Sequence, residues 1–419
     1  MQGIDNGWIK FEKYCIPKES LLNKFADICP DGGYSSKIAS KSKLMAIQFG
    51  SLSGGRIAIA QVSNDCALVY AGATLRYWAV RKQFKNSKAK QETRLLDYSI
   101  NHYRLITKFA THFVQNVGMT KITEFWDEYL DGGLGPDNTK ASFSHLISSV
   151  AKSVFTWTTY DTMSEARQGM GGYGFSSYNG FGSALPVMDL NRTWEGDNNV
   201  LMQQAGKLIL QNLAYLFTDK PLMKTFEFLT MEVPEPKPFI GNLNSITQIL
   251  ELMTFRAITL IHETGTKLQS SEDKVAAWDR LLAFDTYPMT FAYFYRFILS
   301  NYIDFISQFD NDLKTKEVFE RIGLIYGQNI IIEDAEFFRD CLSRAQINEL
   351  KEKLMDNLQL LRKEVVALSY LAPVTDKMMS GMAKHDMKPY ENFLDAVEKA
   401  ERTKNSTTDG DIYIDTSQS

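Results

Sequence analysis

The sequence has few of the residues that build metal centres and covalent cross-links. None of its four cysteines has the C-x-x-C spacing of zinc and redox sites, and none of its five histidines belongs to an H-x-x-x-H pair. We therefore expect no metal site. The scattered cysteines also indicate a reducing compartment without disulfides; they are Cys15, Cys29, Cys66 and Cys341.

Charge and hydropathy exclude two further classes of protein. The chain has 46 basic and 50 acidic residues, a formal net charge of −4, and no long basic run, so nucleic acid is not an expected partner. No apolar stretch reaches the roughly 18 residues of a membrane helix, and the N-terminus is polar. We expect neither a membrane span nor a signal peptide. The remaining composition is that of a globular protein, with 419 residues, enough for two or three domains.

Helical periodicity dominates most of the chain. An apolar-periodic run without proline extends from Leu44 to Phe84, and further helices are expected at about 95–117 and 144–169. The proline-rich segment 232–238 predicts an extended connector, and the sequence is helical again over 246–396. We therefore predict a mainly α protein in which this connector separates two helical domains.

The two ends of the chain differ from this pattern. Residues Gly7 to Glu12 alternate apolar and polar side chains, which is typical of a half-buried strand, and Pro17 ends that pattern. Because one or two strands do not make a stable sheet alone, we interpret this part as the remnant of a β-domain. The polar C-terminal tail is expected to be disordered. The expected boundaries are 1–35, 36–230, 231–402 and 403–419.

One short stretch combines a carboxylate with the start of a helix. In the segment Thr193 to Asn199, Gly196 lets the chain bend beside Glu195. The three residues after the glycine are all good N-caps, and the apolar spacing that follows predicts a helix. The N–H groups at such a helix start suit an anion such as a pyrophosphate. Taken alone, a glutamate before a helix is more often a solvated or capping residue.

Two other kinds of residue are candidates for binding an anion. The segment Gln168 to Phe175 is rich in glycine, which lets a backbone approach a ligand, although an ordinary loop has the same composition. Arg56 lies among small residues, and Arg81 ends an aromatic-rich turn on the same helical run. Either guanidinium could reach a phosphate or lie on a helix surface.

The order and spacing of several motifs resemble the acyl-CoA oxidases, flavin-dependent relatives of the acyl-CoA dehydrogenases. The resemblance covers residue 3 to about residue 400. It rests on Ile4-Asp5-Asn6-Gly7-Trp8, Ile16-Pro17, Leu21 to Asp27, Arg76 to Gln83, Leu95 to Tyr98, Gly171 to Ser176, Thr193 to Asn198, Val365 to Leu368 and Tyr390 to Phe393. In the family, a helical domain and most of a β-domain precede the first of these motifs. The resemblance therefore implies an N-terminally truncated chain: a β remnant, an acyl-CoA dehydrogenase-like helical bundle and a second helical domain.

The resemblance also implies an activity and its residues. Family members use FAD to oxidise a fatty acyl-CoA to the trans-2-enoyl-CoA in β-oxidation, and O2 is reduced to H2O2. Their catalytic base matches Glu195, which would remove the α-proton. The matches to flavin contacts are Arg56, Arg81, Gln168, Gly171, Gly172, Asp197 and Asn198. The matches to acyl-CoA contacts are Gln48, Phe49 and Arg56.

Two implications concern assembly and location. The resemblance implies a homodimer, in which the glycine segment of one subunit meets the flavin of the other. It also implies a peroxisomal location, and the sequence ends Ser417-Gln418-Ser419, not with the Ser-Lys-Leu address. Against the family pattern, Trp194 replaces the usual Phe and Asp197 the usual Glu.

Two alternative readings stay open at this point. A non-catalytic, truncated helical dimerisation protein derived from the family would keep the scaffold without turnover. An acyl-CoA dehydrogenase is a third reading, against which the second helical domain after Pro238 argues. The joint retention of Glu195, Arg56 and Arg81 favours the oxidase, because a scaffold does not need those residue types together.

Overall fold

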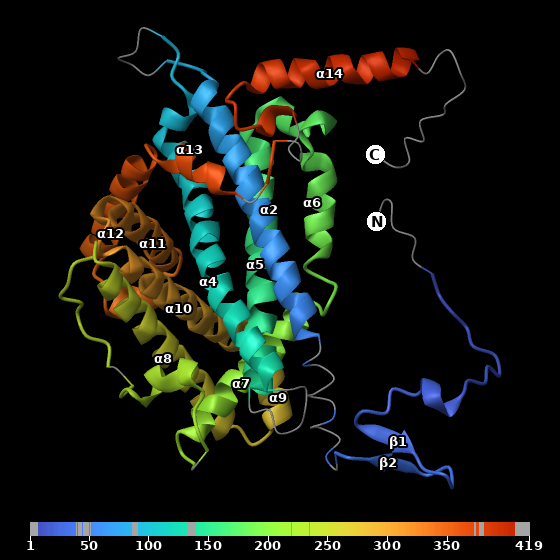
Figure 1. Ribbon diagram of the computed structural model, residues 1–419. Coiled ribbons are helices and arrows are strands. Elements are labelled where there is room, and N and C mark those ends of the chain that lie inside the picture. The colour runs from blue at the N-terminus through green and yellow to red at the C-terminus, as the bar shows by residue number, and fades with distance from the viewer. Residues whose placement is uncertain are drawn as a thin grey trace.

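A computed structural model describes residues 7–38, 40, 44, 50, 52–85, 91–132, 140–218, 220–233, 235–372, 374–376 and 381–406. In these ranges the protein is mainly α-helical, which confirms the predicted fold class (Figure 1). Their sheet is a single hairpin, in which β1 (Ala26–Ile28) pairs antiparallel with β2 (Tyr34–Ser36). No helix of the described ranges has the length and hydropathy needed to cross a membrane.

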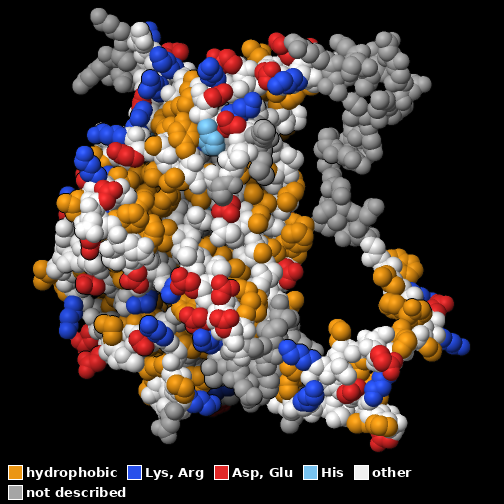
Figure 2. Space-filling model, in the orientation of Figure 1, with side chains coloured by type: hydrophobic (Ala, Val, Ile, Leu, Met, Phe, Trp, Pro, Cys, Tyr) orange, Lys and Arg blue, Asp and Glu red, His pale blue; other side chains and the backbone are white. Residues whose placement is uncertain are grey.

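The strand predicted at Gly7 to Glu12 does not form. The segment is irregular, and its apolar side chains are exposed, as the hydrophobic atoms along it in Figure 2 show. Alternation alone does not make a strand, because the backbone also needs a neighbouring strand for its hydrogen bonds. The hairpin forms instead farther along the chain, around a turn at Gly32, whose φ is +83°.

The first group of helices is built around two long helices that are buried on several sides. These are α2 (Ser53–Val80) and α5 (Ala141–Gly169), which pack along each other. Side chains are buried at every position of α5 from Leu146 to Thr156, so this helix presents no solvated face there. The group also contains α3 (Ser99–Asn101), α4 (Thr107–Asp131), α6 (Phe181–Leu190) and α7 (Asn198–Tyr215).

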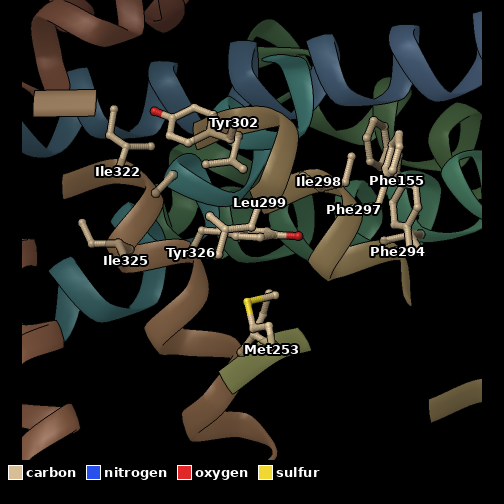
Figure 3. Packing of buried hydrophobic residues seen from close by; sticks show 14 of the residues in the cluster. Phe155, Met253, Phe294, Phe297, Ile298, Leu299, Tyr302, Ile322, Ile325 and Tyr326 are labelled. Carbon is tan, nitrogen blue, oxygen red and sulfur yellow. The ribbon is translucent and has the colours of Figure 1, made fainter. Parts of the chain in front are cut away.

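The second group of helices packs against α4 and α5. It consists of α8 (Ile246–Ser270), α9 (Lys274–Leu281), α10 (Tyr287–Ile306), α11 (Leu313–Glu333) and α12 (Arg344–Leu361). The chain then returns to the first group, where α13 (Val365–Leu368) packs against α2 and α14 (Pro389–Ser406) lies at the end of α2 opposite α7 (Figure 1). The two groups share one hydrophobic core. In Figure 3, Phe155 of α5 lies beside Phe294 of α10, with ring centroids 5.8 Å apart. α14 continues to Ser406, and the rest of the predicted disordered tail lies outside the described residues.

Short 3-10 and π segments lie between the main elements and before the hairpin. The described ones are η1 (Lys18–Ser20), η2 (Leu95–Asp97), η3 (His102–Ile106), η4 (Gly171–Phe175), η5 (Ser177–Asn179), η6 (Lys224–Thr230), η7 (Leu282–Thr286), η8 (Ser307–Phe309), η9 (Phe337–Asp340), η10 (Ser369–Leu371) and η11 (Gly381–Ala383). In the predicted connector, the described residues 232, 233 and 235–238 form no regular element.

Candidate active site

Glu195 lies in the tight turn between α6 and α7, and the residue is exposed. Its φ is +55° and that of Gly196 is +110°, so the chain passes through two left-handed positions in succession. A non-glycine residue in this region costs roughly 1–3 kcal/mol and persists only where its surroundings hold it. The Glu195 carboxylate lies over Gly55 of α2, where a Cβ atom would stand 3.1–3.3 Å from the carboxylate atoms. The glycine thus leaves the space that the carboxylate occupies.

Arg56 holds the backbone of this turn. Its Nε donates a hydrogen bond to the Glu195 carbonyl oxygen (3.0 Å), and its Nη1 donates to His145 Nδ1 (3.0 Å). Burial, with the nearby Arg56 charge, lowers the pKa of His145 to about 4, so its imidazole is neutral near pH 7. The neutral ring then donates from Nε2 to Gln204 Oε1 (2.9 Å). Arg56, which the sequence predicted to contact flavin and substrate, is therefore also a structural support for Glu195.

Lys152 of α5 is a second buried cation at the turn, and the sequence analysis missed it. Its side chain is fully buried, and its Nζ donates to the Gly196 carbonyl oxygen (2.8 Å) and to Asn198 Oδ1 (2.9 Å). Burial lowers the pKa of Lys152 to about 8. The one available signal was a lysine inside a helical run of apolar and small residues, from Ile147 to Phe155. We call Glu195, Arg56, His145 and Lys152 the Glu195 cluster.

The helix start after Glu195 forms as predicted, with Asp197 as the N-cap of α7. Asp197 Oδ1 accepts from the backbone N–H groups of Asn199 (2.9 Å) and Val200 (3.4 Å). Those N–H groups, which the sequence suggested for a pyrophosphate, are thus not free, and a carboxylate already occupies the positive end of the helix. Asn198, another predicted flavin contact, is buried and donates to Thr156 Oγ1 (2.9 Å).

The remaining described flavin candidates gather at the other end of α2. Arg81 follows the last residue of that helix and is half-buried, and its Nη1 donates to Tyr390 Oη of α14 (3.2 Å). This hydrogen bond raises the pKa of Arg81. Tyr390 packs edge-on against Tyr173 of the glycine segment, with ring centroids 5.9 Å apart. Arg81, Gln168, Gly171, Gly172 and Tyr390 are called the Arg81 cluster below.

The glycine segment presents open backbone at this end. Gln168, Gly171 and Gly172 are exposed, and a Cβ atom added at either of these two glycines would meet no atom within 4 Å. Gly171 also has a φ of +60°. Gly174 is different, because its Cβ would lie 2.0 Å from the Arg167 carbonyl oxygen, so it is needed for packing. The space above Gly171 and Gly172 is available to a ligand.

The candidate residues therefore form two clusters, not one pocket. Helix α2 has 28 residues, a length of about 42 Å at roughly 1.5 Å per residue, and the clusters lie at its two ends. Figure 1 shows α7 at one end of α2 and α14 at the other. Gln48 and Phe49, the predicted acyl-CoA contacts, lie outside the described residues.

A cavity of about 530 Å³ lies in neither cluster. It is situated between α4 and α5 on one side and α10 and α11 on the other, and its lining includes Trp157, Phe291 and the ion pair between Arg104 and Glu165 (2.5 Å). None of the predicted site residues lines this cavity. Within the described residues, no group of three or more His, Cys, Asp or Glu side chains could hold a metal ion.

Comparison with known families decides what kind of chain this is. The family described as "Acyl-CoA oxidase, C-alpha1 domain" matches residues 49–210, and the family described as "Acyl-CoA oxidase" matches residues 245–414. The chain belongs to the acyl-CoA oxidase family. The first match contains Glu195, Arg56 and Arg81, and the second contains Tyr390.

Curated acyl-CoA oxidases are similar over much of this chain but are longer. The acyl-coenzyme A oxidase of Debaryomyces hansenii is 26% identical over 418 residues, covering 94% of this chain and 58% of the relative. Acyl-coenzyme A oxidase 2 of Candida maltosa is 34% identical over 242 residues, 54% of this chain and 32% of that protein. The peroxisomal acyl-coenzyme A oxidase 2 of Arabidopsis thaliana is 28% identical over 67% of this chain and 42% of its own length. This chain thus spans less than two thirds of these relatives.

Solved acyl-CoA oxidase structures share the fold. Acyl-CoA oxidase1 of Yarrowia lipolytica superposes with a TM-score of 0.87 at 22% identity, covering 99% of this chain and 64% of that one. Acyl-CoA oxidase-1 of Caenorhabditis elegans, solved with FAD and ATP, gives 0.82 at 20% identity, with 93% and 58% covered. At this identity the likeness establishes the arrangement of the helices.

Proposed function

We propose that this acyl-CoA oxidase chain carries the catalytic base of an FAD-dependent oxidation of fatty acyl-CoA to trans-2-enoyl-CoA. The observation that supports this most strongly is the way in which buried hydrogen bonds hold the turn that carries Glu195. Its carboxylate is exposed over Gly55, while Arg56 and Lys152 bond to the two consecutive carbonyls of the turn. A general base needs a carboxylate held in a defined orientation, because the rate of proton transfer depends on the geometry of the reacting atoms.

The role of this chain in the reaction would be proton removal. Glu195 would take the proton from the carbon next to the thioester, an acid too weak for an unpositioned base at neutral pH. When bound, FAD would accept the β-hydrogen with its electron pair, which O2 would later receive to give H2O2. One C–H bond would yield a proton to Glu195 and the other a hydride to the cofactor. H2O2 would take up both hydrogens, one with the electron pair and one as the proton that Glu195 releases to solvent, so atoms and charges balance.

The residues at the far end of α2 fit a dinucleotide. Arg81 offers a guanidinium for a pyrophosphate, and the exposed backbone at Gly171 and Gly172 has room above it. Gln168 lies exposed beside them. Because Arg56 and Arg81 are 25 residues apart along α2, about 38 Å at roughly 1.5 Å per residue and longer than an extended dinucleotide, one flavin cannot contact both clusters of the same subunit. We therefore propose a homodimer, in which the Arg81 cluster of one subunit contacts the flavin beside Glu195 of the other.

Two features of the proposal rest on the relatives. FAD is present in the solved structure of the Caenorhabditis elegans oxidase, and the Arabidopsis thaliana relative is named peroxisomal. We propose FAD as the cofactor, fatty acyl-CoA and O2 as the substrates, and the peroxisome as the location of this chain. The described residues include the proposed base and the proposed anion-binding residues of such a reaction.

An anaerobic absorbance experiment tests the function. The purified chain, reconstituted with FAD, should lose its flavin absorbance when a long-chain acyl-CoA is added, and it should regain the absorbance and release H2O2 when air is admitted. Glu195→Gln should retain FAD but fail to bleach, because the amide cannot accept the proton. Bleaching of Glu195→Gln at the parental rate would exclude Glu195 as the base. Failure of the parent to bind FAD would instead favour the non-catalytic dimerisation protein.

A further inference from the structure

A lysine without an assigned role lies directly beneath the proposed base. Lys152 is fully buried in the middle of α5, where burying an unpaired ammonium would be very costly. The structure compensates with oxygen acceptors from the catalytic turn, the Gly196 carbonyl (2.8 Å) and Asn198 Oδ1 (2.9 Å). Asn198 is itself held by Thr156 Oγ1 (2.9 Å) of α5. The ammonium therefore joins the turn to the most buried part of the helix bundle.

The turn needs such support because its backbone is strained. Glu195 adopts a left-handed φ of +55°, which a residue with a side chain rarely takes. Arg56 donates to the carbonyl oxygen of Glu195, and Lys152 donates to the next carbonyl oxygen, that of Gly196. Two cations from different helices, α2 and α5, thus hold consecutive carbonyls of the same turn. These two bonds restrain the backbone that directly follows the Glu195 Cα atom, and with it the turn from which the side chain extends.

We propose that Lys152 is a positioning residue for Glu195, whose ammonium holds the left-handed turn in the conformation that aims the carboxylate over Gly55. Its consequence for catalysis rests on the proposed function, in which Glu195 is the base. The geometric part does not depend on that function, because it concerns only the turn and α5. Lys152 is not proposed to touch the substrate.

The contact between Lys152 and the turn should depend on pH. Loss of the proton turns two charge-assisted hydrogen bonds into weaker neutral ones, so the turn should loosen as the pH rises through about 8, the value to which burial lowers the pKa of Lys152. The charged groups that act on it are Arg56 of α2, which lowers this pKa, and Glu195 and Asp197 of the turn, which raise it. His145, two turns earlier on α5, is neutral over this range.

Trp194 provides a reporter that does not require cofactor. It directly precedes Glu195, the residue is 45% exposed, and its indole N–H donates to Asn191 Oδ1 (3.0 Å). The chain contains six tryptophans, so the signal of Trp194 is the difference between each protein and the same protein carrying Trp194→Phe. Emission wavelength and acrylamide quenching would be followed from pH 6.5 to 10. The comparison uses Lys152→Met, Lys152→Arg and, as a matched control, Lys207→Met on the exposed face of α7.

The parent and Lys207→Met should show a transition in quenching centred near pH 8. Lys152→Met should show no transition and quench at every pH as the parent does at pH 10, whereas Lys152→Arg, which stays charged, should keep the low-pH signal throughout. The same transition in Lys152→Met as in the parent, or no transition in the parent, would overturn the proposal. Should Lys152→Met fail to fold, a parental transition that persists in Lys152→Arg would overturn it equally.

A second readout connects the turn to catalysis. In FAD-loaded protein, Lys152→Met should slow acyl-CoA-dependent bleaching about tenfold or more, a typical result of misplacing a reacting group, with little change in the acyl-CoA concentration for half-saturation. Lys152→Arg should restore most of the rate, and an unchanged rate in Lys152→Met would refute the positioning role. Parental bleaching by Glu195→Gln would refute the proposed function alone, while the Trp194 comparison would still decide the role of Lys152.

Discussion

The two ends of α2 carry polar groups in opposite states. In the Glu195 cluster, the side chains of Arg56 and Lys152 are buried and bonded within the protein, and Glu195 alone is exposed. In the Arg81 cluster, Gly171 and Gly172 face open space, and Arg81 has a tyrosine hydroxyl as its neighbour. At the Glu195 end, the buried cations are hydrogen-bonded to other groups of the protein and need no ligand as a partner. The other end is a surface whose backbone groups are accessible to a ligand.

This difference matches the different tasks proposed for the two ends. A group that reacts must be aimed before the substrate arrives, so the bonds that orient it belong to the protein and are present without ligand. A surface that recognises a cofactor gains affinity from hydrogen bonds that form only when the cofactor binds. Its polar groups are therefore accessible in the absence of ligand. The polar groups of the Glu195 cluster are therefore expected to contribute to folding stability, and those of the Arg81 cluster to ligand retention.

The two arginines of α2 give the largest expected contrast. Arg56→Met should lower the free energy of unfolding by about 2–4 kcal/mol, because it leaves the Glu195 carbonyl and His145 Nδ1 without their donor. Arg81→Met should lower it by less than about 1 kcal/mol, since Arg81 is half-exposed with one neutral partner. Urea denaturation with constant m-values measures both changes.

Flavin retention should show the reverse order for the same two variants. After gel filtration, Arg81→Met should lose bound FAD, whereas any folded Arg56→Met should keep more of it. Equal stability losses in both variants would contradict the division between a structural and a ligand-binding end. Full FAD occupancy in Arg81→Met would contradict the role of Arg81.

Local features of the site could be predicted where the chain alone determines them. The helix start at Asp197 follows from N-cap chemistry and apolar spacing, and the bend at Gly196 from its backbone freedom. The mainly helical fold follows from periodicity in the same way. These features depend on residues within a few positions of each other, so the sequence contains the necessary information.

The supports of the base could not be predicted in this way. Lys152 and His145 come from a helix more than 40 residues earlier. Lys152 contacts the turn directly and His145 contacts Arg56, and both contacts exist only after α5 packs against α2 and α7. The occupied N–H groups at Asn199 and Val200 were missed for another reason. The same Asp197 that predicts the helix start also fills the anion site that a free helix start would offer.

Acid should destabilise the Glu195 end through His145. The pKa of this imidazole is lowered from 6.5 to about 4 in the folded protein, so below pH 6.5 the unfolded chain binds a proton that the folded protein excludes. Stability is therefore full above about pH 6.5 and falls as the pH drops toward 4. The slope from one such group approaches about 1.4 kcal/mol per pH unit.

Replacement of the imidazole isolates this contribution. His145→Gln keeps a hydrogen-bonding side chain beside Arg56 and Gln204 but does not titrate, so its stability should depend less on pH between 6.5 and 4 than that of the parent. Urea midpoints measured every half pH unit provide the comparison. Because the Arg81 cluster contains no histidine, Arg81→Met should keep the parental dependence, and an unchanged slope in His145→Gln would refute the assignment.

Two glycines test the same contrast with a single methyl group. Gly55→Ala places a Cβ atom 3.1–3.3 Å from the Glu195 carboxylate, which must move, so bleaching by acyl-CoA should slow about tenfold while FAD stays bound. Gly172→Ala enters open space without backbone strain, so stability should change by less than about 0.5 kcal/mol while FAD binding weakens. The opposite pattern, with FAD lost in Gly55→Ala only, would mean that the ligand surface lies at the Glu195 end.

The smallest expected effect concerns Tyr390. Tyr390→Phe removes the hydroxyl that accepts from Arg81 Nη1 but keeps the ring that packs against Tyr173. The loss in unfolding free energy should stay below about 1 kcal/mol, because water replaces the hydroxyl at a half-exposed guanidinium. If Arg81 is a ligand group, FAD retention should be unchanged or improved, since its guanidinium is then released for the pyrophosphate. A loss of FAD as large as that of Arg81→Met would instead show that the cluster acts through the Arg81–Tyr390 hydrogen bond, and the Arg81 end would then be a built network like the Glu195 end.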